Sequence, residues 1–128
     1  MILADTTIWI DFLAGRTSAL PLRSLLAANR VVCHPAVRGE IALGSIAGRD
    51  EVLILLAQLP PAPVIGDDEV FALIETHKLR ASGIGWIDAY LLAAAMAGRH
   101  VIWTGDKRLA SVATRLGVIA APADFDAR

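Results

Sequence analysis

Four acidic residues stand where their side chains could meet at one edge of a parallel sheet. Asp5 directly follows the apolar run Ile-Leu-Ala, and Asp106 follows "VIWTG", so each comes just after a predicted strand. Glu40 and Asp88 fall within two predicted helices. In open sheets of parallel strands, ligands bind beyond the carboxyl ends of the strands. These positions predict a cluster of carboxylates at that edge.

Each of these acids also has a purely structural interpretation. Asp5 and Asp106 both precede a predicted helix, where an aspartate caps free backbone N–H groups. Glu40 lies on a mostly apolar helical stripe, and Asp88 lies in a helix so apolar that we expect it to be buried all round. A helix dipole supplies only about 0.3–1 kcal/mol to an acid in its first turn, and an unpaired buried charge costs several times that. Glu40 and Asp88 therefore need an arginine, a metal ion or an open cleft.

Four neighbouring carboxylates favour a divalent cation. At 4 Å, each pair repels by about 1–4 kcal/mol in a surface-like dielectric. A cation among them keeps them ionised, and oxygen ligands favour Mg²⁺ or Mn²⁺. The three histidines and single Cys33 show no zinc-binding spacing. Such cations suit phosphodiester hydrolysis, because they activate water and stabilise the leaving oxygen. The hydroxyls of Thr6, Thr7 and Thr104 could support the acids, although helix capping explains Thr6 and Thr7 equally well.

The scaffold for these residues is predicted from short apolar runs that alternate with helical patterns. Such alternation is typical of an α/β fold, and we expect a mostly parallel sheet covered by helices on both faces, in a single domain over 1–128. The predicted strands are 1–5, 30–33, 63–65, 100–104 and 118–120. The predicted helices are 7–14, 18–29, 35–46, 49–58, 67–81, 86–98 and 106–116.

Composition narrows the classes of protein. The chain of 128 residues is 55% apolar, yet no apolar run approaches the roughly 20 residues of a membrane span. The N-terminus lacks the basic segment of a signal peptide, so we expect a cytoplasmic protein without a membrane partner. A net charge of −1 argues against a binder dominated by phosphate contacts. It leaves room for an enzyme that meets RNA through metal ions at one site.

Four segments in this order resemble the PIN-domain nucleases, and among them the small VapC-like toxins of bacterial toxin–antitoxin pairs. They are "LADTTIWIDFL" with Asp5, "PAVRGEIALG" with Glu40, "GWIDAYLLAAA" with Asp88 and "VIWTGDKRLA" with Asp106. The resemblance covers essentially the whole chain. It implies a three-layer PIN-like fold and a Mg²⁺- or Mn²⁺-dependent endoribonuclease that cleaves structured tRNA or rRNA to inhibit translation and growth.

The resemblance also implies roles for individual residues. The catalytic residues and metal ligands would be Asp5, Glu40, Asp88 and Asp106, the last of them holding its ion through water. The supporting hydroxyls would be Thr6 and Thr104, and the candidates for RNA contact are Lys107 and Arg108. Gly105 stands where many members carry a larger, often basic residue, which puts an RNA contact from that position in doubt.

Partners follow from the same resemblance, which implies a homodimer and a cognate antitoxin. The sequence adds a reason of its own, because helix 49–58 is apolar on most of its circumference. Together with Ile41, Leu43 and Ile46 it could form a groove for an amphipathic helix. The alternative is an ordinary buried pair of helices.

Other functions fit the acids less well. A phosphoacceptor receiver would need a second acid beside Asp5 and an aspartate after a middle strand, and a phosphatase would need an acid in place of Thr7. A non-catalytic RNA-binding relative would have lost one of the four acids. A PIN nuclease of RNA processing that is not a toxin is a further alternative. The remaining acid near the N-terminus, Asp11, lies about one turn into a predicted helix, where we expect it to face solvent or pair with Arg16.

Overall fold

A three-stranded parallel sheet lies at the centre of the computed structural model, which describes residues 1–126. The central strand is β1 (Ile2–Ala4), which pairs with β2 (Val31–Val32) on one side and β3 (Val101–Trp103) on the other. Every residue of β1 is buried, as expected for a central strand covered on both faces. The predicted α/β class with a parallel sheet is therefore confirmed.

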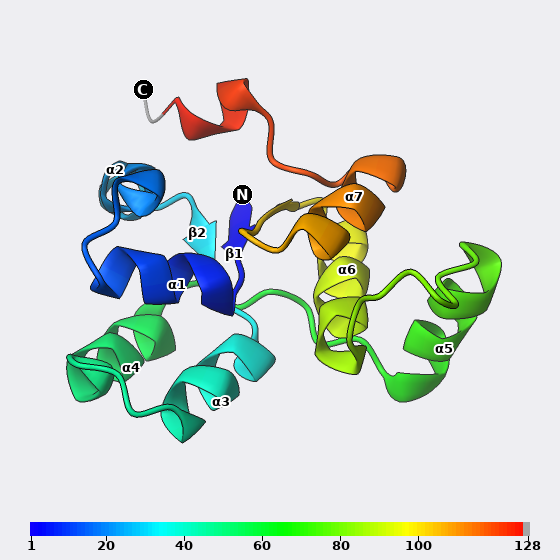
Figure 1. Ribbon diagram of the computed structural model, residues 1–128, viewed down its shortest axis with the longest axis horizontal. Coiled ribbons are helices and arrows are strands. Elements are labelled where there is room, and N and C mark those ends of the chain that lie inside the picture. Colours follow the sequence, from blue (N-terminus) through cyan, green and yellow to red (C-terminus); the bar gives the residue numbers. More distant parts are fainter. Residues whose placement is uncertain (127–128) are drawn as a thin grey trace.

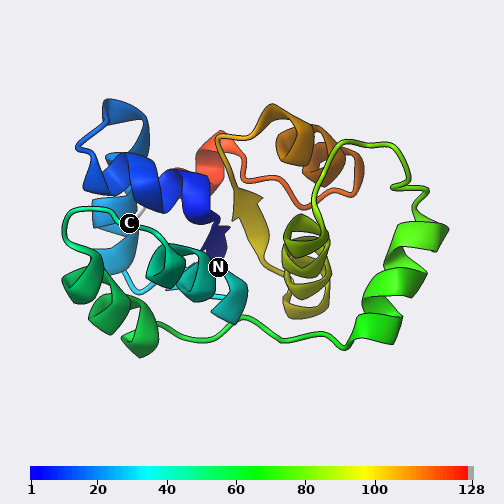
Figure 2. The same cartoon turned by 60° about the horizontal axis from the view of Figure 1, so that its bottom comes forward.

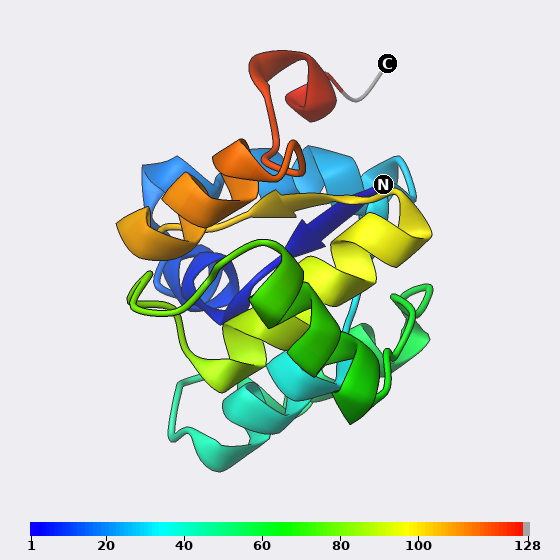
Figure 3. The same ribbon diagram turned by 90° about the vertical axis from the view of Figure 1, so that its right-hand side faces the viewer.

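Helices cover both faces of this sheet. Figure 3 shows α6 on one side of the strands and α7 on the other. Figures 1 and 2 show α4 and α5 at opposite ends of the molecule. The α-helices are α1 (Thr6–Leu13), α2 (Pro21–Ala27), α3 (Pro35–Leu43), α4 (Arg49–Gln58), α5 (Asp67–Thr76), α6 (Trp86–Gly98) and α7 (Lys107–Arg115). Two short 3-10 helices are η1 (Thr17–Ala19) and η2 (Pro122–Phe125). None of the helices in residues 1–126 is both long and apolar enough to cross a membrane.

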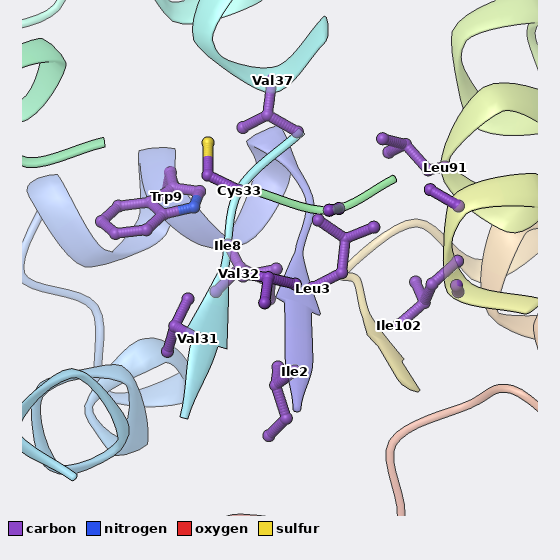
Figure 4. Packing of buried hydrophobic residues seen from close by; sticks show 14 of the residues in the cluster. Ile2, Leu3, Ile8, Trp9, Val31, Val32, Cys33, Val37, Leu91 and Ile102 are labelled. Atoms are coloured by element: carbon purple, nitrogen blue, oxygen red, sulfur yellow. The ribbon is translucent and has the colours of Figure 1, made fainter. Parts of the chain in front are cut away.

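The core packs the helices against the strands (Figure 4). Leu3 of β1 lies opposite Val32 and Ile102 in the sheet register, and all three side chains are buried. Trp9 of α1 and Leu91 of α6 are buried in the same cluster. Since the helices that follow β1 and precede β3 are both anchored in this core, the residues at their starts are held at defined positions beside the sheet.

Two predicted strands are wrong. The segment 118–120 makes a single parallel bridge, between Ile119 and Ile102. The segment 63–65 forms no strand, and the chain makes a single parallel bridge earlier, between Pro61 and Cys33. Proline has no backbone N–H and cannot extend a ladder, and this part of the chain contains Pro60, Pro61 and Pro63. Val64 within the segment 63–65 is 66% exposed, so the segment is neither a regular strand nor a buried one.

Several predicted helix ends are also wrong, for local reasons. The helix expected over 67–81 ends at Thr76, and Lys78 and Ala81 beyond it have φ of 54° and 61°, the left-handed region. The helix expected over 18–29 is divided into η1 and α2, with Pro21 in the first turn of α2. The helix expected over 35–46 ends at Leu43. The predicted bounds of α4 and α6 are confirmed.

The first turn of α6 is more exposed than its apolar sequence predicts. Trp86 is 42% exposed and Ile87 is 36% exposed, whereas the residues from Leu91 to Ala95 are buried. The expectation that this helix is buried all round is therefore wrong at its N-terminal end. Apolar side chains are left at the surface beside Asp88.

Candidate active site

Asp5 lies at the carboxyl end of the central strand, and its side chain is 5% exposed. Its backbone N–H donates to the carbonyl of Trp103 (3.0 Å), which continues the pairing of β1 with β3 by one residue. Its carboxylate accepts from the backbone N–H of Ile8 (Oδ1, 3.3 Å) and so caps α1. Asp5 therefore caps α1 and also lies at the predicted edge of the sheet, so the two interpretations do not exclude each other.

Two threonine hydroxyls hold the Asp5 carboxylate. Thr7 Oγ1 donates to Asp5 Oδ1 (2.5 Å), and Thr104 Oγ1 donates to Asp5 Oδ2. Each hydroxyl also accepts a backbone N–H from the turn after β3: Thr7 from Gly105 (2.8 Å) and Thr104 from Asp106 (3.0 Å). Because Asp5 itself caps α1, the capping interpretation of Thr7 is wrong. The turn that carries Asp106 is connected to Asp5 through both hydroxyls.

Glu40 is connected to the same edge through Thr6. The Thr6 hydroxyl donates to Glu40 Oε1 over 2.7 Å, so Thr6 supports an acid and does not cap α1. Glu40 is exposed, although it is next to the buried Ile41. The argument that Glu40 needs a partner because its stripe is buried is therefore wrong, since the stripe is buried at Val37 and Ile41 only.

Asp88 approaches from α6. It is the third residue of the helix, half-buried, and its Oδ2 accepts from the backbone N–H of Gly85 (3.0 Å), so it satisfies a free donor at the helix start. Burial raises the pKa of the Asp5 carboxyl, and the negative charge of Asp88 adds to that rise. The structure thus brings Asp88 to the electrostatic neighbourhood of the β1 edge.

Asp106 caps α7 and is exposed. Its Oδ1 accepts from the backbone N–H groups of Arg108 (2.8 Å) and Leu109 (3.2 Å), and its own N–H donates to Thr104. One carboxylate oxygen is engaged by the helix, and the other accepts none of these bonds. The capping interpretation of Asp106 is confirmed, together with its place in the turn that is connected to Asp5.

Electrostatics set Asp5 apart from the other acids. Burial raises the pKa of the Asp5 carboxyl above its ordinary value, and the charge of Asp88 adds to the rise. The hydrogen bonds from Thr104, Thr7 and Ile8 oppose that rise in pKa, because they favour the ionised form. A cation nearby would favour the ionised form further, which is the behaviour expected of a metal ligand.

The donor set fits a hard divalent cation. In residues 1–126 none of the four acids forms an ion pair with Lys, Arg or His, so arginine pairing of Glu40 or Asp88 is not seen there. Nor do any three His, Cys, Asp or Glu side chains within that range form a ready cage for a metal. Mg²⁺ keeps several waters and is bound through one or two carboxylates plus substrate phosphates rather than by a complete protein cage. The four acids, Asp5, Glu40, Asp88 and Asp106, offer carboxylate oxygens only, which suits that mode.

Two basic side chains directly follow Asp106 in the sequence. Lys107 and Arg108 lie in the first turn of α7 and are exposed. The Arg108 side chain lies against Gly83, where a Cβ would be only 2.7 Å from its Cδ. Gly83 has a φ of +88°, so both the backbone and the close approach require glycine. The Arg108 side chain therefore lies beside the loop that leads into α6 and Asp88.

Sequence reasoning missed the role of His34. Its ring is buried, and Nδ1 accepts from the backbone N–H of Ala36 (3.0 Å), so His34 caps α3, the helix that carries Glu40. Burial lowers the pKa of His34, which keeps the ring neutral and able to accept. The signal in the sequence is its place one residue before Pro35, a proline in the first turn.

The predicted pairing of Asp11 with Arg16 is confirmed (2.5 Å).

Asp5 at the end of β1, Asp88 at the start of α6 and Asp106 at the start of α7 stand beside a parallel sheet, as the PIN-domain resemblance implies. The match to the PIN domain covers residues 2–115, and the chain belongs to the PIN domain family. Its VapC-like character is confirmed by two curated relatives. The chain is 44% identical to Ribonuclease VapC32 of Mycobacterium tuberculosis strain H37Rv, over 122 residues that cover 94% of this chain and 97% of that protein. The protein of the same name from strain CDC 1551 matches to the same extent.

Proposed function

We propose that this protein is a metal-dependent endoribonuclease of the VapC-like toxin class, which cleaves structured tRNA or rRNA and so inhibits translation and growth. The observation that carries the proposal is the Asp5 carboxylate, buried at the carboxyl end of the central strand and held there by the hydroxyls of Thr7 and Thr104. The 44% identity to Ribonuclease VapC32 supports ribonuclease activity rather than another use of acids at a strand end. The cytoplasm, where such RNA is found, is its proposed place of action.

Each acid has a role that its surroundings support. Asp5, Glu40 and Asp88 would hold Mg²⁺ or Mn²⁺ directly, and Asp106 would hold it through water. When bound, the cation lowers the pKa of the attacking water and neutralises charge on the phosphate. The Thr104 and Thr6 hydroxyls orient Asp5 and Glu40 by the hydrogen bonds described above. Orienting contacts of this kind fix the direction of the ligand oxygens.

Lys107 and Arg108 are proposed to bind the RNA backbone beside the acids. Both are exposed in the first turn of α7, directly after Asp106. Because the whole chain has a net charge of −1, attraction of a polyanion depends on local cations and on the bound metal. Contacts to phosphates of this kind position the RNA without reading its sequence.

An antitoxin is proposed to cover the surface of α3 and α4. Leu43 is 90% exposed and Ile54 is 63% exposed, and we call these two side chains the α3–α4 patch. A hollow between the same helices is lined by Pro35, Arg38, Gly39, Ala42 and Leu53. The groove expected from the sequence is thus partly wrong in its members, since Ile41 is buried in the core. Exposed apolar side chains beside a hollow are the features to which the apolar face of an amphipathic helix binds. Because α3 also carries Glu40, a partner bound there would lie on the helix that carries one of the acids.

A second copy of the chain is proposed to cover the opposite end of the molecule. The α5–α6 patch, defined as Val64, Phe71, Trp86 and Ile87, is exposed, and the rings of Phe71 and Trp86 lie 4.9 Å apart. The first turn of α5 is acidic, with Asp67, Asp68 and Glu69, and the chain beyond its end carries Lys78 and Arg80. A two-fold axis across α5 would set the acidic end of one copy against the basic end of the other.

The proposal is tested by expressing the protein in bacteria and sequencing the 5′ ends of cellular RNA. Wild type should arrest growth and create new RNA ends at a small set of positions, and Asp5→Ala should do neither at equal protein level. New ends without growth arrest would indicate the alternative, a PIN nuclease that is not a toxin. The absence of new ends with soluble, folded wild type would overturn ribonuclease activity.

A further inference from the structure

The hydroxyl of Thr7 connects two segments that are far apart in the sequence. It donates to Asp5 Oδ1 (2.5 Å) and accepts from the backbone N–H of Gly105 (2.8 Å). Asp5 and Thr7 lie at the end of β1 and the start of α1, whereas Gly105 lies in the turn between β3 and α7. The hydroxyl therefore acts as donor toward the carboxylate and as acceptor toward the turn, a combination that few side chains of this size offer.

Helix capping does not account for this hydroxyl. Asp5 is the N-cap of α1, and Thr7 is the second residue of the helix. The Thr7 side chain is instead directed to Asp5 and to Gly105, and a Cβ on Gly105 would lie 3.4 Å from Thr7 Oγ1. Packing, hydrogen bonding and the absence of a side chain at Gly105 all bring the turn close to Thr7.

Removal of the hydroxyl would leave two groups without this partner. Asp5 Oδ1 would keep only the longer bond from Ile8 (3.3 Å). The Gly105 N–H, one residue before Asp106, would lose its acceptor. Thr104 would still hold Asp5 Oδ2 and the Asp106 N–H, so the fold of the turn would persist while its distance from Asp5 became less constrained.

We propose that Thr7 is a positioning residue, whose hydroxyl connects the Asp5 carboxylate to the Gly105–Asp106 turn and so holds both acids in place for a divalent cation and an RNA phosphate. This inference rests on the proposed nuclease function for its cation and substrate. It assigns to Thr7 a role that neither the capping interpretation nor the supporting pair of Thr6 and Thr104 includes.

The geometric part is tested without RNA. Thr7→Val removes the hydroxyl and keeps the branched shape, Thr7→Ser keeps the hydroxyl, and Thr114→Val is the matched control on α7, where the hydroxyl donates only to its own helix. By amide NMR, Thr7→Val should accelerate hydrogen exchange at Gly105 and leave Asp106 protected. Calorimetric titration with Mn²⁺ alone should show about 10–100-fold weaker binding to Thr7→Val, with Thr7→Ser and Thr114→Val close to wild type.

The functional part is measured on the same variants. The RNA cleavage rate of Thr7→Val should fall about 10–100-fold with little change in KM, and Thr7→Ser should restore it. If Thr7→Val binds Mn²⁺ and protects Gly105 as wild type does, the positioning role is overturned. If Mn²⁺ binding and protection change as expected but wild type cleaves no RNA, the nuclease proposal fails and the role of Thr7 stands. Thr7→Ala repeats both measurements should Thr7→Val not fold.

Discussion

At the scale of the residue, the site depends on Asp5, whose burial disfavours the ionised form of its carboxyl. Asp5 is buried and interacts with Asp88, and in residues 1–126 no lysine or arginine pairs with it. Hydrogen bonds from the Thr7 and Thr104 hydroxyls and from the Ile8 N–H stabilise the ionised form. A divalent cation would stabilise the ionised form further. The ionisation of Asp5 is therefore coupled to the stability of the folded protein.

Asp5→Asn should therefore stabilise the metal-free protein at neutral pH. The raised pKa means that the folded state holds the Asp5 proton more tightly than the unfolded state does. Stability from this group is present below the unfolded-state pKa of about 3.9 and is lost as pH rises through the folded pKa. The advantage of Asp5→Asn should thus be present at pH 7 and vanish below about pH 4.

Thermal denaturation with and without Mg²⁺ checks this expectation. Added Mg²⁺ should raise the melting temperature of wild type and leave that of Asp5→Asn nearly unchanged, since the variant lacks the charged ligand. An equal rise for both proteins would show that the cation binds elsewhere.

At the scale of the element, the acids were easier to predict than the segments between them. The strands that end at Asp5 and near Asp106 follow from short apolar runs, and α6 from thirteen helix-forming residues. The segment with Pro60, Pro61 and Pro63 contains no regular strand, although one was expected at 63–65. Helix α5 ends at Thr76, before Lys78 with its left-handed backbone, and is shorter than expected. Such local outcomes depend on tertiary contacts that no single-sequence pattern records.

The site itself was predicted as residue types but not as contacts. Asp5, Glu40, Asp88 and Asp106 were identified from their places at strand ends and in helices. The bonds that Thr7 accepts from the Gly105 N–H and that His34 accepts from the Ala36 N–H could not be predicted, because a hydroxyl or imidazole has several partners within reach until the backbone is placed.

Helix α3 should make the protein sensitive to mild acid through its cap. His34 must be neutral to accept the Ala36 N–H, and burial lowers its pKa. As pH falls below the unfolded-state value of about 6.5, the unfolded chain takes up a proton that the folded state resists, so stability falls. His34→Asn keeps an acceptor for the cap and should reduce the loss of melting temperature between pH 7.5 and 5.

The remaining acid sensitivity is expected from His100, whose pKa is lowered by burial and by the N-terminal amine. Melting curves of wild type, His34→Asn and His100→Asn across this pH range separate the two contributions. An unchanged pH dependence in His34→Asn would contradict the neutral cap.

At the scale of the whole molecule, two apolar surfaces lie at opposite ends, with the acids between them. The α3–α4 patch and the α5–α6 patch include residues of α4 and α5, the two helices that Figure 1 places at the left and right ends of the molecule. Exposed apolar side chains in groups of this kind are typical of interaction sites. Separate positions allow two partners to bind at once, a second copy of the chain and an antitoxin.

Leu43→Asp should abolish binding of the cognate antitoxin and leave nuclease activity intact. The substitution buries a charge in the proposed interface, and Leu43 is 90% exposed in the free protein, so folding should be unaffected. Leu20→Asp, at a 54% exposed leucine before α2, is the control and should keep the partner. Co-purification from cells that express both proteins is the measurement, and retention of the antitoxin by Leu43→Asp and by Ile54→Asp would exclude this surface.

The central claim is that carboxylates at the β1 edge cleave RNA with a divalent cation. The most direct measurement is the cleavage rate of end-labelled RNA by the purified protein, first in EDTA and then across a Mg²⁺ titration. Wild type and Asp11→Ala should be inactive in EDTA and gain equal activity with Mg²⁺, because Asp11 pairs with Arg16 at the surface. Asp88→Ala should lose more than about 100-fold at every Mg²⁺ concentration while remaining folded. Cleavage that persists in EDTA, or in folded Asp88→Ala, would contradict the account.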